Sequence, residues 1–143
     1  MFDFEKAPNI SCLGIFLGAL ASHFIGALWF GPLFGKLWLK YSNWDPEQIK
    51  KTAKQTMMRS MLISFIAQIV MAVILAYVLG YMKVQTVVEA VKIAFLLGVG
   101  FIATTTINGH LWHTDKLEFF LINLASNITR LVAMTAVYAS IAL

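Results

Sequence analysis

Residues 10–34 read ISCLGIFLGALASHFIGALWFGPLF, an almost uninterrupted apolar stretch. A membrane-spanning helix needs ~20 such residues to cross the hydrocarbon core. Small residues recur at every fourth position of the stretch, at Gly14, Gly18, Ser22 and Gly26. That spacing leaves a groove that a second helix can approach closely, inside one bundle or between two copies of the chain. A substrate path along the groove is the alternative. The stretch therefore predicts a membrane helix with a packing seam.

Three further apolar stretches of similar length follow, at about residues 59–81, 87–108 and 117–142. Of the 143 residues, 59% are hydrophobic and only 13% are charged, which is too few charges to cover a soluble domain. We therefore predict an all-α polytopic membrane protein, a single domain over residues 1–143 with four transmembrane helices in a bundle. The composition excludes a sizeable soluble domain, and the lone Cys12 excludes a disulfide scaffold.

Lysine and arginine residues set the expected orientation, because basic loops stay on the cytoplasmic side of a membrane. Seven fall in the first-to-second and third-to-fourth connections, namely Lys36, Lys40, Lys50, Lys51, Lys54, Arg59 and Lys116. Three fall on the opposite side, namely Lys6, Lys83 and Lys92. We therefore expect both termini outside. The net charge of +4 then reflects topology, and nucleic acid is not an expected partner.

Asp45-Pro46-Glu47 predicts a helix start, because it combines an N-cap side chain, a proline in the first turn and an acid beside it. We expect an amphipathic helix over about residues 46–58, on the cytoplasmic membrane surface and running into the second span. It either anchors the topology or binds a lipid or a partner. Before it, Gly31-Pro32 should kink or end the first span. This segment turns at the interface or forms a re-entrant element that lines a cavity.

Residues 26–38, GALWFGPLFGKLW, combine a glycine, a Trp-aromatic pair, Pro-Leu, Phe-Gly and a second tryptophan. Together with Trp44-Asp45-Pro46-Glu47, Asn108 and Phe120-Leu121-Ile122-Asn123, this motif resembles the domain-of-unknown-function family seventeen sixty-one. Its members are small bacterial four-span proteins. The resemblance covers nearly the whole chain and implies a four-span fold in the bacterial inner membrane, without a biochemical activity. The chain departs from the family's pattern after Asn108, where it reads GHLWHTD instead of a more basic link.

Arg130 lies about 13 residues from either end of the fourth span, near the bilayer centre. An arginine at that depth costs at least ~2.5–3.5 kcal/mol and must face the bundle interior, water or a partner. Asn123 and Asn127 share its helix face. Counting residues from the cytoplasmic ends of the other spans places further polar side chains at similar depths, namely His23, Gln68, Thr105 and Asn108. We therefore predict a polar pocket of these residues that opens inward, with Arg130 at its floor.

No aspartate or glutamate lies at the depth of Arg130, so the pocket is a candidate site for a small anion, a metabolite or a lipid head group. Alternatively, the polar groups only hydrogen-bond the helices together, in an accessory or structural protein without a substrate. The chain has no recognisable catalytic, haem-attachment or phosphate-loop motif, so we expect neither an enzyme nor a cofactor. The expected partners are membrane lipids and a second copy of the chain, as a dimer.

The three histidines give two further candidates. His110 and His113, with Asp115 nearby, have the spacing of a metal clip but lack the third and fourth ligands of a closed site. We expect an interfacial loop at this link and no metal. His23 is either a proton relay or cofactor ligand, or a buried histidine bonded to a neighbour.

Overall fold

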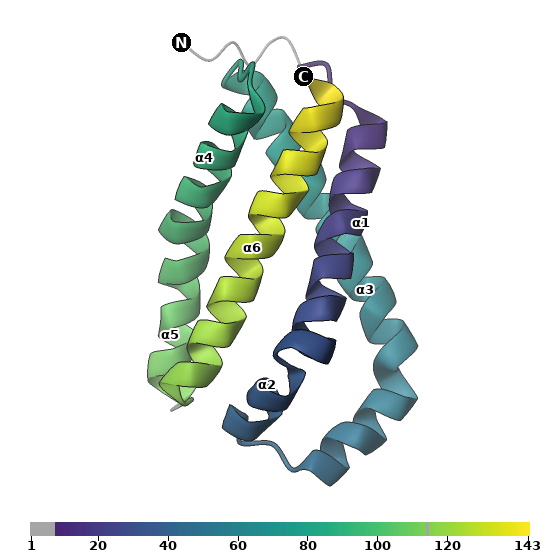
Figure 1. Cartoon of the computed structure of the whole chain (residues 1–143), viewed down its shortest axis with the longest axis vertical. Coiled ribbons are helices and arrows are strands. Elements are labelled where there is room, and N and C mark those ends of the chain that lie inside the picture. The colour runs from purple at the N-terminus through teal and green to yellow at the C-terminus, as the bar shows by residue number, and fades with distance from the viewer. Residues whose placement is uncertain (1–7, 114) are drawn as a thin grey trace.

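The computed structural model describes residues 8–113 and 115–143, which form helices packed side by side (Figure 1). In chain order these are α1 (Cys12–Leu28), the π-helical turn η1 (Trp29–Leu33), α2 (Gly35–Tyr41), α3 (Pro46–Tyr81), α4 (Val87–Leu97), the π-helical segment η2 (Gly98–Ala103), α5 (Thr104–His113) and α6 (Leu117–Ala142). The described residues contain no strand. Lys6, used in the charge count, and Thr114, in the histidine link, lie outside the described residues.

Four helical stretches are long and apolar enough to cross a membrane: Cys12–Leu33, Pro46–Tyr81, Val87–His113 and Leu117–Ala142. The predicted all-α, four-span architecture is therefore confirmed. The beginning of α1 and the end of α6 lie together at one end of the bundle (Figure 1), as an even number of spans requires.

Two predicted boundaries need correction. The third span continues to His113, because η2 and α5 extend α4 without interruption. The link is thus helical from Gly109 to His113, and the predicted interfacial loop is wrong there. The amphipathic helix predicted over residues 46–58 is not a separate element but the first part of α3, a single helix of 36 residues. At ~1.5 Å per residue α3 is about 54 Å long, far longer than the ~30 Å hydrocarbon core.

Polar caps fix where the helices begin. The Ser11 hydroxyl accepts a hydrogen bond from the Gly14 amide at 3.1 Å, and the Asp45 carboxylate accepts one from the Glu47 amide at 3.1 Å. Pro46 occupies the first turn of α3, where an amide proton would have no partner within the helix. Each cap satisfies a backbone donor that the helix itself leaves open. The predicted helix start at Asp45-Pro46-Glu47 is confirmed.

The first span changes direction at Gly31-Pro32, as the proline predicts. Pro32 has no amide proton to donate, and Gly31 takes φ −95° and ψ −105°, outside the helical region. The helix resumes at Gly35, where a Cβ atom would clash with the carbonyl oxygen of Phe30. Only glycine fits this close turn, which redirects the chain into the short helix α2. The sequence patterns do not predict α2 as a separate helix.

Helix α6 packs against both α1 and α4, and α3 packs mainly on α1 (Figure 1). The small residues of α1 lie at its contact with α6. A Cβ atom on Gly14 would lie 3.0 Å from the Tyr138 ring, and one on Gly18 would lie 2.9 Å from the Met134 carbonyl oxygen. The seam is therefore filled by α6 of the same chain, and a homodimer would have to use another surface.

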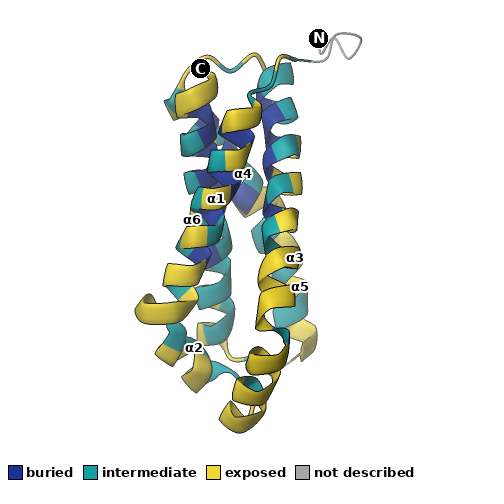
Figure 2. Ribbon diagram, turned by 90° about the vertical axis from the view of Figure 1, so that its right-hand side faces the viewer, coloured by how far each residue is buried: buried dark blue, intermediate teal, exposed yellow. Residues whose placement is uncertain are grey.

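The buried core lies in the half of the bundle nearer the start of α1 and the end of α6 (Figure 2). Its fully covered apolar residues include Ala19, Ala76, Ala94 and Met134, one from each spanning helix. At the opposite end, the first half of α3 stands apart from α1 and α2 and is mostly exposed (Figures 1 and 2). The candidate site lies where these two halves meet.

Candidate functional site

Arg130 extends from the middle of α6 across to α1. Its Nε donates a hydrogen bond to the Ser22 carbonyl oxygen at 3.1 Å. The guanidinium lies directly against Gly26, where a Cβ atom would be 3.0 Å from both Cζ and Nε. The absence of a side chain on Gly26 is what lets the arginine approach the α1 backbone so closely. The fourth step of the small-residue seam thus accommodates Arg130.

The outer nitrogens of Arg130 have no partner within the described residues. The Nε bond to Ser22 is the one hydrogen bond that the side chain makes there, and no carboxylate forms an ion pair with it. A guanidinium has five N–H donors, so four of them remain available. A desolvated charge without a counter-charge is costly, and these donors can bind an anion with strong, charge-assisted hydrogen bonds.

A cavity of about 250 Å³ lies beside the guanidinium. It is lined by His23, Gly26, Ala27 and Phe30 from the first span, by Ser60, Met61 and Ser64 from α3, and by Arg130 from α6. Two serines, a histidine and an arginine are thus among the lining residues, while most of the cavity wall is apolar. No aspartate or glutamate lines this cavity. Its chemistry suits a small anion.

A buried hydrogen bond fixes one end of the site. The Ser22 hydroxyl donates to Gln68 Oε1 at 2.7 Å, and both side chains are buried. The carbonyl oxygen of the same Ser22 holds Arg130. Helices α1, α3 and α6 are therefore tied together at one residue. Gln68 is not among the residues that line the cavity. It contributes indirectly, by holding Ser22 in place through their hydrogen bond.

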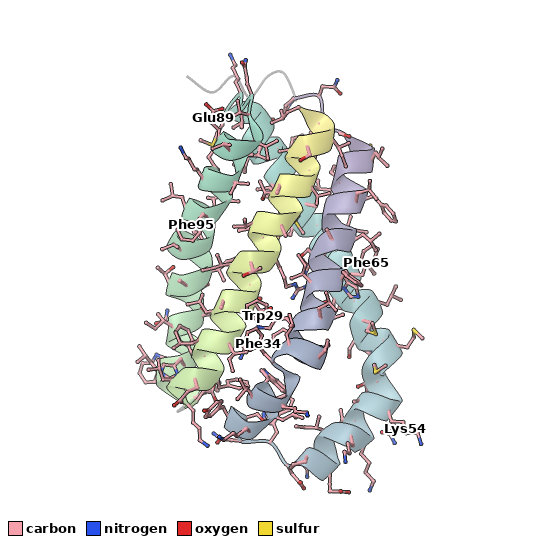
Figure 3. The ribbon with its side chains drawn as sticks, viewed as in Figure 1. Trp29, Phe34, Lys54, Phe65, Glu89 and Phe95 are labelled. Carbon is pink, nitrogen blue, oxygen red and sulfur yellow. The ribbon has the colours of Figure 1, made fainter. Side chains whose placement is uncertain are left out.

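His23 lines the cavity next to an aromatic wall. Its ring meets the Phe65 ring edge to face, with 5.5 Å between the centroids. Figure 3 shows Phe65 at the α1 side of α3, where the two helices still pack together. His23 is half-buried. This placement lets its imidazole contact a ligand in the cavity while one ring edge packs against the phenyl group.

Asn123 and Asn127 lie on α6 below Arg130, but outside its cavity. Asn123 accepts a hydrogen bond from Trp38 Nε1 at 3.2 Å and donates one to the Phe119 carbonyl oxygen at 2.9 Å. It therefore attaches α2 to α6. Asn127 is half-buried and forms no hydrogen bond within the described residues.

The third span contributes nothing to this cavity, which corrects the prediction of a pocket formed by all four spans. Thr105 and Asn108 are exposed, and the Thr105 hydroxyl donates to the Phe101 carbonyl oxygen of its own helix. The reason is geometric. Counting residues gives the depth of a side chain along a helix, but not the direction in which it points around the axis.

Conversely, depth counting missed Ser60, Met61 and Phe30 as lining residues. Ser60 and Ser64 are four residues apart, so they are neighbours on one helix face. The four-residue spacing of the two serines is therefore the sequence feature that indicates a polar face on α3. Sequence alone, however, does not indicate that this face of α3 turns toward α1 rather than toward lipid.

The two histidines of the third span form no metal centre with their neighbours. The His110 ring stacks on Phe120 at 5.0 Å between centroids. His113 Nδ1 lies 2.9 Å from the Gly109 carbonyl oxygen. The described residues contain no group of three or more metal-ligating His, Cys, Asp or Glu side chains. In this part of the chain the histidines contact their own helix and α6.

Aromatic side chains fasten the end of the first span beside the cavity. Trp29 Nε1 donates to the Ile122 carbonyl oxygen of α6 at 3.2 Å, and the Trp29 and Phe34 rings lie 4.6 Å apart. Figure 3 shows both rings next to α6, at the bend that leads to α2. Trp38 continues the contact, with its ring 5.5 Å from that of Phe119. The tryptophans of the first-span motif therefore hold the bend against α6.

Comparison with known protein families matches residues 13–139 to the family described as "Protein of unknown function (DUF1761)". No curated protein and no solved structure matches the chain. The matched region includes the second and third spans, all but the outermost residues of the first and fourth, and every residue of the Arg130 cavity. The chain therefore belongs to the DUF1761 family.

Proposed function

We propose that this protein binds a small anion in the cavity beside Arg130. The observation that carries the proposal is an arginine at the middle of a membrane-spanning helix that has one hydrogen bond, no ion pair within the described residues and an adjoining cavity. An arginine at that depth costs at least ~2.5–3.5 kcal/mol on insertion scales. An anion in the cavity would offset that cost by supplying the missing counter-charge.

The neighbouring groups support an anion rather than a cation or a neutral ligand. The lining contains the Arg130 guanidinium, the Ser60 and Ser64 hydroxyls and the His23 imidazole, but no carboxylate. Hydroxyl and imidazole N–H groups can donate to the same ligand. The proposed activity is binding, as part of transport or sensing, rather than catalysis. No cofactor is part of the proposal.

A structural role without any ligand is the second candidate function. It is favoured by the bond from Arg130 Nε to the Ser22 carbonyl oxygen and by the fit of the guanidinium against Gly26. In that case Arg130 would hold α6 to α1, and the protein would serve as an accessory component of the membrane. The two candidates predict different responses to added anions.

The proposed location is the bacterial cytoplasmic membrane, with both termini outside. The support is the charge count, in which seven basic residues fall in the two connections at one end and three at the other. In this orientation the start of α3 and all of α2 lie at the cytoplasmic end. The cavity lined by the first part of α3 shares Ser60 and Met61 with the Arg130 cavity, so the Arg130 cavity would communicate with the cytoplasm.

The test is the effect of anions on the stability of the purified protein in detergent. A ligand that binds only the folded state at ten times its Kd stabilises that state by about 1.4 kcal/mol. Sodium chloride, sodium acetate and sodium phosphate should be compared at matched ionic strength, with unfolding followed by tryptophan fluorescence. We expect at least one of these anions to stabilise the wild-type protein but not Arg130→Gln.

Two variants sharpen the comparison. Arg59→Gln removes the chain's other arginine, which lies outside the cavity, and should respond to anions like wild type. Arg130→Lys keeps the charge but loses the planar fork, so it should respond more weakly. Kosmotropic anions stabilise any protein by exclusion from its surface. An equal effect on wild type and Arg130→Gln would therefore contradict the proposal. An Arg130→Gln protein that is much less stable, with no anion effect on wild type, would favour the structural role.

A further inference from the structure

Helix α3 carries a hydrophilic side chain at every fourth position over five consecutive steps. We call these residues the polar strip: Gln48, Thr52, Thr56, Ser60, Ser64 and Gln68. Residues four apart are neighbours on a helix surface, so the strip is a ridge that turns around α3 by about 40° per step, or roughly 200° from Gln48 to Gln68. It runs from the first turns of the helix to the bond between Gln68 and Ser22. The strip therefore ends at Gln68, the hydrogen-bond partner of Ser22, whose carbonyl oxygen holds Arg130.

Two adjoining cavities follow this strip. The outer one, of about 730 Å³, is lined by Gln48, Thr52, Thr56 and Ser60 together with residues 43–45 and several apolar side chains of α3. The inner one is the Arg130 cavity, which Ser60 and Ser64 line. Ser60 and Met61 line both. Hydrophilic residues are thus found along the lining from the start of α3 to the arginine, among apolar ones.

The serines of the strip differ from the three threonines at the start of α5. Thr104, Thr105 and Thr106 all donate to carbonyl oxygens of their own helix, which is how such groups are normally satisfied in an apolar environment. Ser60 and Ser64 make no hydrogen bond within the described residues. Both residues line the Arg130 cavity, where a hydroxyl group without an intramolecular partner can bind water or an anion.

We infer that the polar strip of α3 is the route by which a small, water-soluble anion reaches Arg130 from the Pro46 end of the helix. The inference rests on the proposed function and specifies the ligand as a hydrophilic ion rather than a lipid head group. Five lysines lie in α2 and the first turns of α3, namely Lys36, Lys40, Lys50, Lys51 and Lys54, against two acids, Asp45 and Glu47. This excess of positive charge would concentrate anions at the mouth of the route.

Asp45 lines the outer cavity and is the one carboxylate on the route. Its Oδ1 accepts the Glu47 amide proton at the N-terminus of α3, where the helix dipole offsets its charge. Lys54 projects away from the bundle (Figure 3). The lysines therefore act through their summed electrostatic field at the mouth of the route. Along the route the contacts come from Ser60 and Ser64, since the Thr56 hydroxyl already donates to the Thr52 carbonyl oxygen.

Cysteine accessibility in reconstituted vesicles tests this route. Cys12, which is exposed, is first replaced by serine, and single cysteines are then placed on the strip as Thr56→Cys, Ser60→Cys and Ser64→Cys. Leu62→Cys, Ile63→Cys and Ile66→Cys are the matched controls, since these side chains of the same stretch are exposed on other faces of α3. The probe is the water-soluble anion methanethiosulfonate ethylsulfonate. Circular dichroism verifies that each variant is folded.

We expect the strip cysteines to react about 10-fold faster than the controls, because a thiolate in contact with water is the reacting species. Adding Arg130→Gln should slow the reaction at Ser64→Cys more than at Thr56→Cys. Equal rates at strip and control positions would overturn the route while leaving anion binding at Arg130 intact. Fast reaction that does not depend on Arg130, or that favours a cationic reagent of the same size, would overturn the anion route and also count against the proposed function.

Discussion

Replacing Gly18 by alanine should weaken the contact between α1 and α6. The added Cβ atom would lie 2.9 Å from the carbonyl oxygen of Met134, whereas ordinary van der Waals contacts lie at 3.4–4 Å. The obstacle is backbone of α6 rather than the end of a flexible side chain. The two helices must therefore separate locally, by about 0.5–1 Å, and lose packing against each other.

The expected magnitude follows from two opposing terms. Overpacking of a tight contact costs about 1–3 kcal/mol, while alanine is a better helix former than glycine by about 1 kcal/mol. Gly109→Ala is the matched control, because Gly109 is also helical and nothing lies within 4 Å of its Cβ position. Both variants gain the same helix propensity from replacing glycine by alanine. Their difference in unfolding free energy should therefore equal the overpacking cost, about 1–3 kcal/mol.

The assay is unfolding of the detergent-solubilised variants by increasing sodium dodecyl sulfate, followed by far-ultraviolet circular dichroism. We expect Gly109→Ala to be at least as stable as wild type and Gly18→Ala to be less stable than Gly109→Ala. If the two alanine variants were equally stable, α1 and α6 would not pack through the small-residue seam as described.

Three further predictions concern the same bundle. Ser22→Ala and Gln68→Ala should each reduce stability, and a double-mutant cycle should give a coupling of about 0.6–1.7 kcal/mol for their hydrogen bond; additive effects would contradict that bond. Trp38→Phe should lose the bond to Asn123 but keep the ring packing, so a double-mutant cycle with Asn123→Ala should give a coupling of about 0.6–1.7 kcal/mol; losses that simply add would contradict the bond. Cys12 is exposed in the first turn of α1. In cells with a permeabilised outer membrane and an intact inner membrane, it should react with a membrane-impermeant maleimide. Labelling only after the inner membrane is lysed would contradict the proposed orientation.

Much of the fold follows from local sequence. The apolar lengths define the four spans, and Asp45 and Pro46 mark the start of α3 because their chemistry satisfies a helix N-terminus. The kink at Pro32 follows from its missing amide proton. The interfacial loop predicted after Asn108 is wrong, because the helix continues to His113. Gly109 lies within α5 with open space around it.

The candidate site was only partly predictable. The depth of Arg130 follows from its distance to the span ends, and the seam spacing indicates that Gly26 faces another helix. The rotation of each helix about its axis is set by tertiary packing, which local patterns do not contain. Ala90 and Ala94 turn toward the core of the bundle. Thr105 lies 11 residues after Ala94 and would share its face on a regular α-helix, but Thr105 is exposed. The π-helical segment η2 between them changes the register of the residues that follow it. Tertiary packing likewise brings His23 of α1 and Ser64 of α3 to one cavity. The sequence around each residue does not predict that they meet.

Direct titration of the purified protein by calorimetry tests the central claim that Arg130 is an anion-binding residue. Sodium phosphate, sodium acetate and sodium chloride are titrated in turn into wild type, Arg130→Gln and Arg59→Gln. The account predicts a saturable heat with one anion bound per chain for at least one of these salts. That heat should persist in Arg59→Gln and disappear in Arg130→Gln. The absence of saturable heat with all three anions, or the same heat in Arg130→Gln, would contradict it.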